Sequence, residues 1–290
     1  MKRATGHAFQ PYAVVSRTGP HVTMQAGIEQ AGRYWTTTAA TSLKARSVRA
    51  HGHASAALVD GDRTRIVAGR TMALEPFRPW RGLEDPVAAL TWGLAVARLG
   101  RAHLDQLLGY LEAPGAVPAD WLPTRRVLLA TRIDRSLTLV DDVVVDRHGD
   151  WGDESMLMSQ SDALVGALPL ALLPATHRSV VAGGSRAHLG VSTPAGPVVL
   201  PVRWLGDDRF SVSAAGFAAV NADPVGPASV VFDRSDSRRP DEKQGVMFRG
   251  RLRVDDVVDG KAVVGLTTAR VTTWDGFAAD TVDVGATTVR

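Results

Sequence analysis

The sequence predicts a mainly β protein with α insertions, built from two tandem copies of one strand-rich domain. Three observations support this prediction. Runs rich in β-branched and aromatic residues alternate with Gly-containing turns in both halves of the chain. One segment, at about 83–112, is instead rich in Ala and Leu at helical spacing. The order of turns and strands in the first half then recurs in the second.

Length and composition place the chain among ordinary globular proteins. It has 290 residues, 45% of them apolar and 22% charged, which suggests two domains or one large one and excludes disordered, collagen-like and coiled-coil classes. The absence of Cys excludes disulfides, thiolate metal sites and Cys nucleophiles, and it fits a reducing compartment. Residues 4–11 are too polar for a signal sequence, and the apolar stretch 87–97 is too short to cross a bilayer. We therefore expect a cytoplasmic protein with no membrane partner.

The charge distribution argues against nucleic acid as a partner. The net charge is +3, but Arg and Asp are interleaved along the chain and no basic block appears. Only four of the 33 basic residues are Lys, so the position of each Lys is informative. A small-molecule substrate is the expected partner.

The first part of the chain is predicted to form strands separated by short turns. Gly19-Pro20 is the turn of the first hairpin, and Asp60-Gly61 is the turn of a later one. Between them, Thr41 or Ser42 caps a short helix that ends at His51-Gly52. The expected strands are 12–16, 22–26, 34–38, 54–59 and 64–74.

The next segment changes to helical patterning and then returns to strands. Asp85-Pro86 is a favourable helix start, and the expected elements are helices at 87–99 and 102–111 and strands at 126–133 and 136–140. A Gly-, Ser- and Pro-containing stretch follows and includes one apolar helical piece, 163–173. The expected organisation is a first domain at 1–148 with its helical insertion, a linker with a helix at 149–176, and a second domain at 177–290.

An internal repeat is the strongest feature of the sequence. Four matches occur in the same order, and both parts of the last match share one sequence offset. The matched segments are Gly19-Pro20 with Gly196-Pro197, 54–60 with 228–233, Gly69-Arg70 with Gly250-Arg251, and 127–130 and Arg135 with 262–265 and Arg270. The order indicates a tandem duplication.

The segment around the first short helix resembles a known family. A strand ends in Thr38 and is followed by Ser42-Leu43-Lys44 and Arg46, then by the strand 54–59 and its Asp60-Gly61 turn. This order is similar to that of the split-barrel flavin-binding superfamily, which includes pyridoxamine 5'-phosphate oxidase and the flavin/deazaflavin oxidoreductases. The resemblance implies a six-stranded Greek-key barrel that usually dimerises, with the cofactor between two barrels. Two tandem split barrels would form an intrachain pseudo-dimer, either as a monomer or in a further homodimer.

The residues of this segment suit a phosphate group. A helix N-terminus offers free N–H groups and the positive end of the helix dipole. Ser42 can donate a hydrogen bond, Lys44 supplies a point charge, and Arg46 supplies a bidentate contact if it faces the anion. The resemblance implies that Thr38 also belongs to the cofactor-binding residues. An ordinary capped helix with a solvated basic face is the alternative interpretation. The matching part of the second copy, 212–220, has no Lys or Arg, so we expect at most one cofactor per chain.

The resemblance implies FMN or the deazaflavin coenzyme F-420 as cofactor, and an oxidoreductase that transfers hydride to or from an unknown small molecule. The chain shows no nucleophile elbow, Walker loop or dinucleotide fingerprint, and no catalytic residue is assigned. Residues 281–290 lack the substrate motif of pyridoxamine 5'-phosphate oxidase itself, so that activity is not expected. The alternatives are a degenerate split-barrel binding protein without catalysis, and a haem protein that uses one of the histidines His21, His177 and His188.

Two other groups are given ordinary interpretations. His51 and His53 lack the spacing of a metal pair, and no metal site is expected. Trp35, Trp204 and Trp274 are expected in the core rather than against a ligand. The charged loop 238–243 is longer than its counterpart at Asp60-Gly61, and a role as a cover of the groove is a hypothesis.

Overall fold

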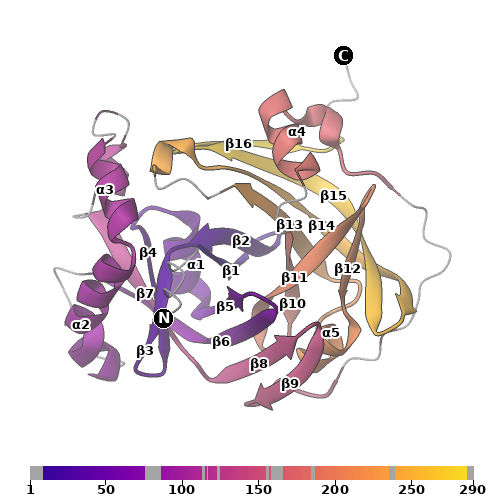
Figure 1. The fold of residues 1–290 in the computed structure, drawn as a ribbon, viewed down its shortest axis with the longest axis horizontal. Coiled ribbons are helices and arrows are strands. Elements are labelled where there is room, and N and C mark those ends of the chain that lie inside the picture. The colour runs from indigo at the N-terminus through magenta and orange to yellow at the C-terminus, as the bar shows by residue number, and fades with distance from the viewer. Residues whose placement is uncertain are drawn as a thin grey trace.

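The chain folds into two curled antiparallel sheets that lie against each other (Figure 1). The computed structural model describes residues 9–75, 86–112, 115, 117–122, 125–154, 157, 166–183, 187–234 and 239–285. The first sheet contains β1 (Gln10–Ser16), β2 (Gly19–Gln25), β3 (Gly27–Gln30), β4 (Arg33–Ala39), β5 (His53–Asp60), β6 (Arg63–Leu74), β7 (Arg126–Arg132), β8 (Arg135–Val140) and β9 (Val143–His148). The second contains β10 (Ala187–Thr193), β11 (Gly196–Gly206), β12 (Arg209–Ser213), β13 (Pro227–Arg234), β14 (Gln244–Val258), β15 (Lys261–Asp275) and β16 (Ala278–Asp283).

The two sheets have the same strand connectivity. The second runs in the order β12-β11-β10-β13-β14-β15-β16, and pairing of β12 with β15 closes a six-stranded barrel. The first runs β2-β1-β5-β6-β7-β4-β3 and curls into a half-barrel, because the one long strand β11 corresponds to two short strands, β2 and β3, with Ala26 between them. The predicted fold class is confirmed: the protein is mainly β and consists of two tandem split barrels.

One pair of glycines shows why the repeat was visible in the sequence. Gly69 interrupts β6 where that strand changes partner from β8 to β7, and Gly250 lies at a register shift of β14 against β15. A Cβ on Gly69 would collide with the carbonyl oxygen of Arg132, and a Cβ on Gly250 with that of Thr267. Arg132 and Thr267 are themselves related by the sequence offset of the repeat. Both barrels therefore need Gly at the same crossing point.

The barrels meet across a pseudo-two-fold interface. Gly19, the first residue of β2, packs against Pro227 at the start of β13, and Gly196, the first residue of β11, packs against His53 at the start of β5. Strands β1 and β2 contact β11 and β10 in the same reciprocal way. Buried residues from both sheets, including Ala13 and Val22 of the first and Val191 of the second, form one continuous core. Reciprocal contacts of this kind are the mark of an isologous interface.

Helices cover the ends of the barrels. In the first half, α1 (Leu43–His51) packs on β1 and β6, and α2 (Pro86–Ala102) packs on β3 and β4 and continues into α3 (Leu104–Glu112) and the short η2 (Ala119–Trp121). In the second half the helices are η4 (Leu170–Leu172), α4 (Ala175–Ala182), α5 (Ala214–Ala219) and η5 (Pro240–Glu242). The helix expected at 163–173 lies partly outside the described residues, and its described part forms only η4, whereas α4 was not expected.

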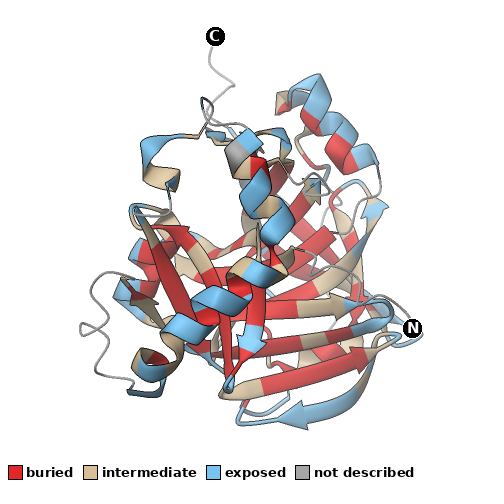
Figure 2. Ribbon diagram, turned by 60° about the vertical axis from the view of Figure 1, so that its left-hand side comes forward, coloured by how far each residue is buried: buried red, intermediate tan, exposed pale blue. Residues whose placement is uncertain are grey.

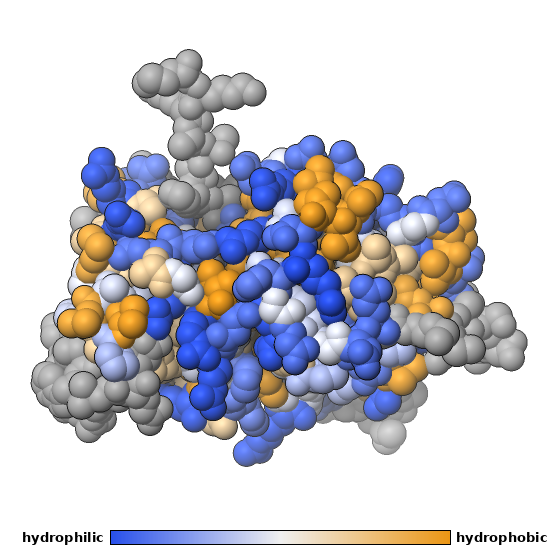
Figure 3. Space-filling view, turned by 90° about the horizontal axis from the view of Figure 1, so that it is seen from below, coloured by the Kyte–Doolittle hydropathy of each residue, from blue (hydrophilic) through white to orange (hydrophobic). Residues whose placement is uncertain are grey.

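Burial follows the strands, whereas α2 and α3 have mostly exposed and half-buried residues (Figure 2). The face in Figure 3 is largely hydrophilic, with its hydrophobic side chains in separate groups. Among the described residues no helix is long and apolar enough to span a bilayer.

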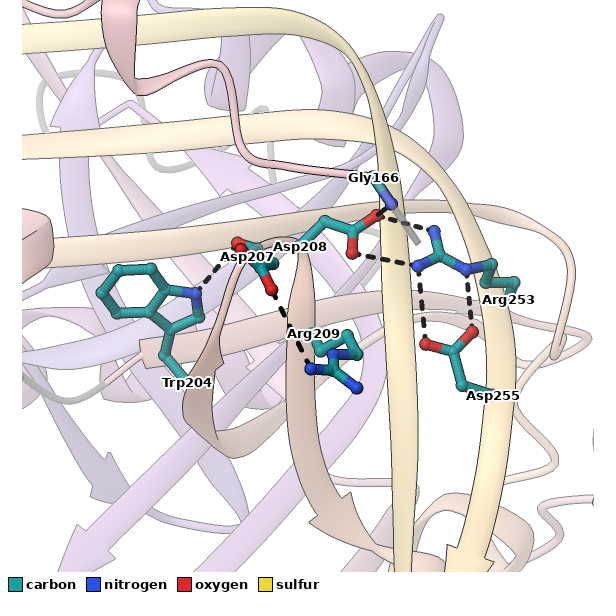
Figure 4. A network of polar contacts seen from close by, with 7 residues as sticks. All are labelled: Gly166, Trp204, Asp207, Asp208, Arg209, Arg253 and Asp255. Atoms are coloured by element: carbon teal, nitrogen blue, oxygen red, sulfur yellow. Dashed lines mark hydrogen bonds and ion pairs between the residues drawn. The ribbon is translucent and has the colours of Figure 1, made fainter. Parts of the chain in front are cut away.

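A buried ion pair fixes the connection between the halves to the second barrel (Figure 4). Arg253 of β14 donates to both carboxylate oxygens of Asp208, at 2.8 and 3.0 Å, and the Arg253 and Asp208 side chains are 8% and 2% exposed. The same carboxylate accepts from the backbone N–H of Gly166 at 3.1 Å. Asp255 receives a further hydrogen bond from Arg253 at 2.7 Å. The pair therefore stabilises both the barrel and the path of the preceding connection.

Candidate functional site

The start of α1 lies directly after β4 and is held by side-chain hydrogen bonds. Ser42 is the N-cap, and its Oγ accepts from the backbone N–H of Ala45 at 3.1 Å. The hydroxyl of Thr38, near the end of β4, lies 3.0 Å from the same Oγ. Gly52 ends the helix with φ 64°, and its N–H bonds to the carbonyl of Val48. Two of the predicted site residues, Thr38 and Ser42, therefore lie side by side at the helix start.

Lys44 is buried between α1 and β2. Its side chain points inward, the residue is only 9% exposed, and Nζ donates to Thr23 Oγ1 at 3.2 Å. Burial, together with repulsion from Arg126, lowers the pKa of Lys44 from 10.5 to about 7. A buried ammonium with one neutral partner is unfavourable unless an anion joins it.

Arg46, the fourth predicted residue, lies elsewhere. It is exposed, because two residues along a helix correspond to a rotation of about 200°, so Arg46 and Lys44 point to opposite sides of α1. The structure therefore gathers Thr38, Ser42 and Lys44 and leaves Arg46 on the surface.

Arg126, which the sequence analysis did not identify, is the principal cation beside Lys44. It lies at the start of β7, next to β4, and its Nε and Nη2 donate to Thr37 Oγ1 at 3.1 and 2.8 Å. The guanidinium lies 5.5 Å from the centre of the Trp121 ring, a cation–π contact. Burial lowers the pKa of Arg126, and interaction with the Tyr110 hydroxyl partly offsets this.

The second barrel contributes a lysine and an aromatic ring to the same region. Lys243 follows η5, and burial lowers its pKa to about 8, with an opposing effect of Asp233 and a further lowering by Arg126. Its Nζ lies 3.4 Å from the centre of the Phe9 ring. Phe277, in the β15–β16 turn, contacts Trp121 at 5.1 Å between ring centres. Parts of both barrels therefore surround Arg126.

Arg249 of β14 is a further cation of this region and lies near the start of β2. Arg249 donates to Thr272 Oγ1 at 2.9 Å and to Thr18 Oγ1 at 3.4 Å. His21 is buried, and its pKa falls to about 3 because of this burial and of the charges of Lys44 and Arg249. We call Lys44, Arg126, Lys243 and Arg249 the interbarrel cation cluster.

The donor set of the cluster suits a phosphate-bearing molecule. Among the described residues, the interactions that set the pKa values of Lys44 and Arg126 include no carboxylate. Ammonium, guanidinium and hydroxyl groups are the usual ligands of phosphate oxygens. The aromatic rings of Tyr110, Trp121 and Phe277 adjoin the cations and offer flat apolar surface. The cluster can therefore bind an anion attached to a ring system.

Two sequence signals could have revealed the missed residues. Arg126 and Lys261 are related by the sequence offset of the repeat, and Lys243 is one of only four Lys in the chain. Both Arg126 and Lys243 lie far in sequence from Lys44, and only the fold brings them together. Of the three tryptophans discussed above, Trp35 is fully buried, and Trp204 and Trp274 pack against the core as expected. The described residues contain no group of three or more His, Asp or Glu able to hold a metal ion.

Comparisons with known proteins gave matches among solved structures alone. No protein-family model matches the chain, and no curated protein matches its sequence. One similar structure is a pyridoxamine 5'-phosphate oxidase-related, FMN-binding protein from Nostoc punctiforme, with 13% identity, TM-score 0.33, 47% of this chain covered and 76% of the other. An F-420 reductase has 18% identity, TM-score 0.30 and coverages of 45% and 89%. A FAD-binding protein from Mesorhizobium loti has 14% identity, TM-score 0.33 and coverages of 46% and 86%.

Proposed function

We propose that the chain binds one phosphate-bearing flavin, either FMN or the deazaflavin coenzyme F-420, at the interbarrel cation cluster. We further propose that it acts as an oxidoreductase on a small molecule. The observation that carries this proposal is the buried, repelling pair Lys44 and Arg126, for which the described residues supply no carboxylate partner. A bound phosphate would compensate both charges.

The residues fit such a cofactor in distinct roles. Thr38, Ser42, Lys44 and Arg126 would hold the phosphate, and the rings of Trp121 and Phe277 would pack against the flat part of the molecule. When bound, a flavin supplies the hydride chemistry itself, so the protein needs to position it and exclude water. The first barrel (1–148) would supply the phosphate site, the connection 149–176 would hold the halves together, and the second barrel (177–290) would form the far wall.

A non-catalytic binding protein is the second candidate. One observation favours it: α5, which follows β12 as α1 follows β4, consists of Ala, Gly and Phe and has no basic residue. The second copy therefore has no counterpart of Lys44 in this helix. Haem is less favoured, because both ring nitrogens of His177 already contact Trp274 and Thr176, and His21 is buried near the charges of Lys44 and Arg249.

The test is a parallel titration of the protein with FMN, F-420 and haem, followed by absorbance and fluorescence. Binding of one flavin per chain, weakened strongly by Lys44→Met and much less by Arg46→Met, would support the proposed site. A Soret band on haem addition with no flavin binding would replace the proposal by a haem protein. Flavin binding without turnover of any reductant or acceptor would favour the non-catalytic alternative.

A further inference from the structure

The pseudo-two-fold relation places a counterpart of the interbarrel cation cluster on the opposite side of the interface. Strand pairing aligns Ala39 with Arg126 in the first barrel and Ser213 with Lys261 in the second. Lys261 is therefore the positional equivalent of Arg126. By the same pairing Ser211 is the equivalent of Thr37, the hydroxyl residue that Arg126 binds. A cation next to a hydroxyl side chain is thus present in both copies.

A surface groove lies at this second position. It has a volume of about 370 Å³ and is lined by Asp142, Lys261, Ser211 and Arg203 together with the apolar side chains of Pro201, Val202 and Leu205. Two cations, a hydroxyl and an apolar wall are the same kinds of group that surround Arg126. Apart from the Asp142 carboxylate, the groove is therefore chemically suited to a small anionic molecule.

The two positions differ in the residue that the other barrel's hairpin turn places beside Arg126 or Lys261. In the first copy the β15–β16 turn presents Phe277 to the aromatic group beside Arg126. In the second copy the β8–β9 turn presents Asp142, which the offset of the repeat makes the equivalent of Phe277. The Asp142 carboxylate forms an ion pair with Lys261, and the Asp142 backbone carbonyl accepts a hydrogen bond from the Ser213 hydroxyl.

We infer that the groove at Lys261 is a latent second anion site, in which the Asp142 carboxylate pairs with the ammonium that would otherwise bind a ligand's anionic group. The inference rests on the proposed function, because it takes a phosphate at Arg126 as its template. The ion pair would explain why a chain with two related sites binds one ligand. Asp142, in the β8–β9 hairpin of the first barrel, neutralises Lys261 of the second barrel.

The test replaces the carboxylate without disturbing the turn. Asp142 has φ 67°, a conformation that Asn tolerates well, so Asp142→Asn keeps size and backbone and removes the charge. Asp141→Asn is the matched control, because Asp141 is an exposed neighbour in the same turn with φ 48°. Both variants lose one negative charge, but only one releases Lys261.

The measurement is equilibrium dialysis with labelled inorganic phosphate, which needs no cofactor. We expect Asp142→Asn to bind phosphate at the Lys261 groove several-fold more tightly than Asp141→Asn, so that at one fixed phosphate concentration it holds more phosphate per chain than the control. Adding Lys261→Met to Asp142→Asn should abolish the gain. Equal binding by the two single variants, or a gain that persists without Lys261, would overturn the inference.

The same experiment separates this inference from the proposed function. Loss of phosphate binding in Lys44→Met reports on the first site, and the difference between Asp142→Asn and Asp141→Asn reports on the second. If flavin titration shows no binding through Lys44 while Asp142→Asn gains a phosphate site, the proposed function fails and the latent site stands. Circular dichroism of each variant verifies that the fold is retained.

Discussion

Replacement of Lys44 by Met should change ligand affinity and stability in opposite directions. Met has a similar length and no charge, so it removes the ammonium while filling the space between α1 and β2. The charge-assisted contact to a phosphate is worth about 1.5–3 kcal/mol, so FMN or F-420 affinity should fall by roughly 10- to 150-fold. In the ligand-free protein the same substitution removes a buried charge and should be stabilising.

The size of the stabilisation follows from the Lys44 pKa. Folding lowers this pKa from 10.5 to about 7, so between these pH values the unfolded chain binds more protons than the folded one. The free energy of unfolding of wild-type protein therefore rises with pH across this window. The penalty removed by Met is at most roughly 5 kcal/mol at pH 7 and about 2 kcal/mol at pH 9. Loss of the bond to Thr23 subtracts about 1 kcal/mol.

The difference in free energy of unfolding is measured by urea unfolding of ligand-free wild type and Lys44→Met at pH 7 and pH 9. Flavin titration at the same pH values measures binding. Wild-type affinity should fall as pH rises from 6 to 9, because Lys44 and Lys243, with pKa values of about 7 and 8, lose their protons. A Lys44→Met protein that is less stable than wild type at pH 7 and binds flavin equally well would refute the reasoning. Lys44 would then be a structural residue that acts through Thr23.

Three further substitutions test the fold and the extent of the site. Gly69→Ala should cost at least about 2 kcal/mol in urea unfolding, because its Cβ would collide with the Arg132 carbonyl, whereas Gly93→Ala on open α2 surface should be neutral or stabilising by up to about 1 kcal/mol. Arg253→Met should lower the free energy of unfolding by about 3–5 kcal/mol, because it leaves the Asp208 carboxylate buried and unpaired. A double variant that also replaces Asp208 by Asn should lose less of this free energy. Lys243→Met should weaken flavin binding several-fold without loss of stability, and unchanged affinity would place the phosphate nearer Arg249.

Local sequence signals predicted most of the fold. Asp60-Gly61 marked a hairpin turn that the structure contains, and the Gly69 and Gly250 match marked the strand crossings of both barrels. Gly19-Pro20 marked the first hairpin, but its turn is Arg17-Thr18, because Gly19 pairs with Ser16 and Pro20 with Val15. These signals were readable because a turn or a crossing restricts the residue type at one position. The helix expected at 163–173 had no such restriction, and within the described part of this range Leu170–Leu172 form a short 3₁₀ turn before α4.

The sequence could indicate the residues of the candidate site that lie close together in the chain, but not those that only the fold brings near. Ser42 and Lys44 lie within one helix start, so a local pattern identified them. Helical periodicity alone is sufficient to place Arg46 on the opposite side of α1 from Lys44. Arg126 and Lys243 reach the same region through strand pairing and the interface between barrels. No local pattern encodes that proximity.

The reciprocal contacts of Gly19 with Pro227 and of Gly196 with His53 join two halves of one polypeptide. When single barrels associate as identical subunits, dilution separates them and every substitution enters both copies. A covalent connection instead holds the halves at an effective concentration of about millimolar, whatever the protein concentration. Each side of the interface is then free to diverge, as Pro227 and His53 already have. Fusion thus permits one chain to carry Arg126 beside aromatic rings on one side of the interface and Lys261 paired with Asp142 at the equivalent position on the other, which a pair of identical subunits cannot do.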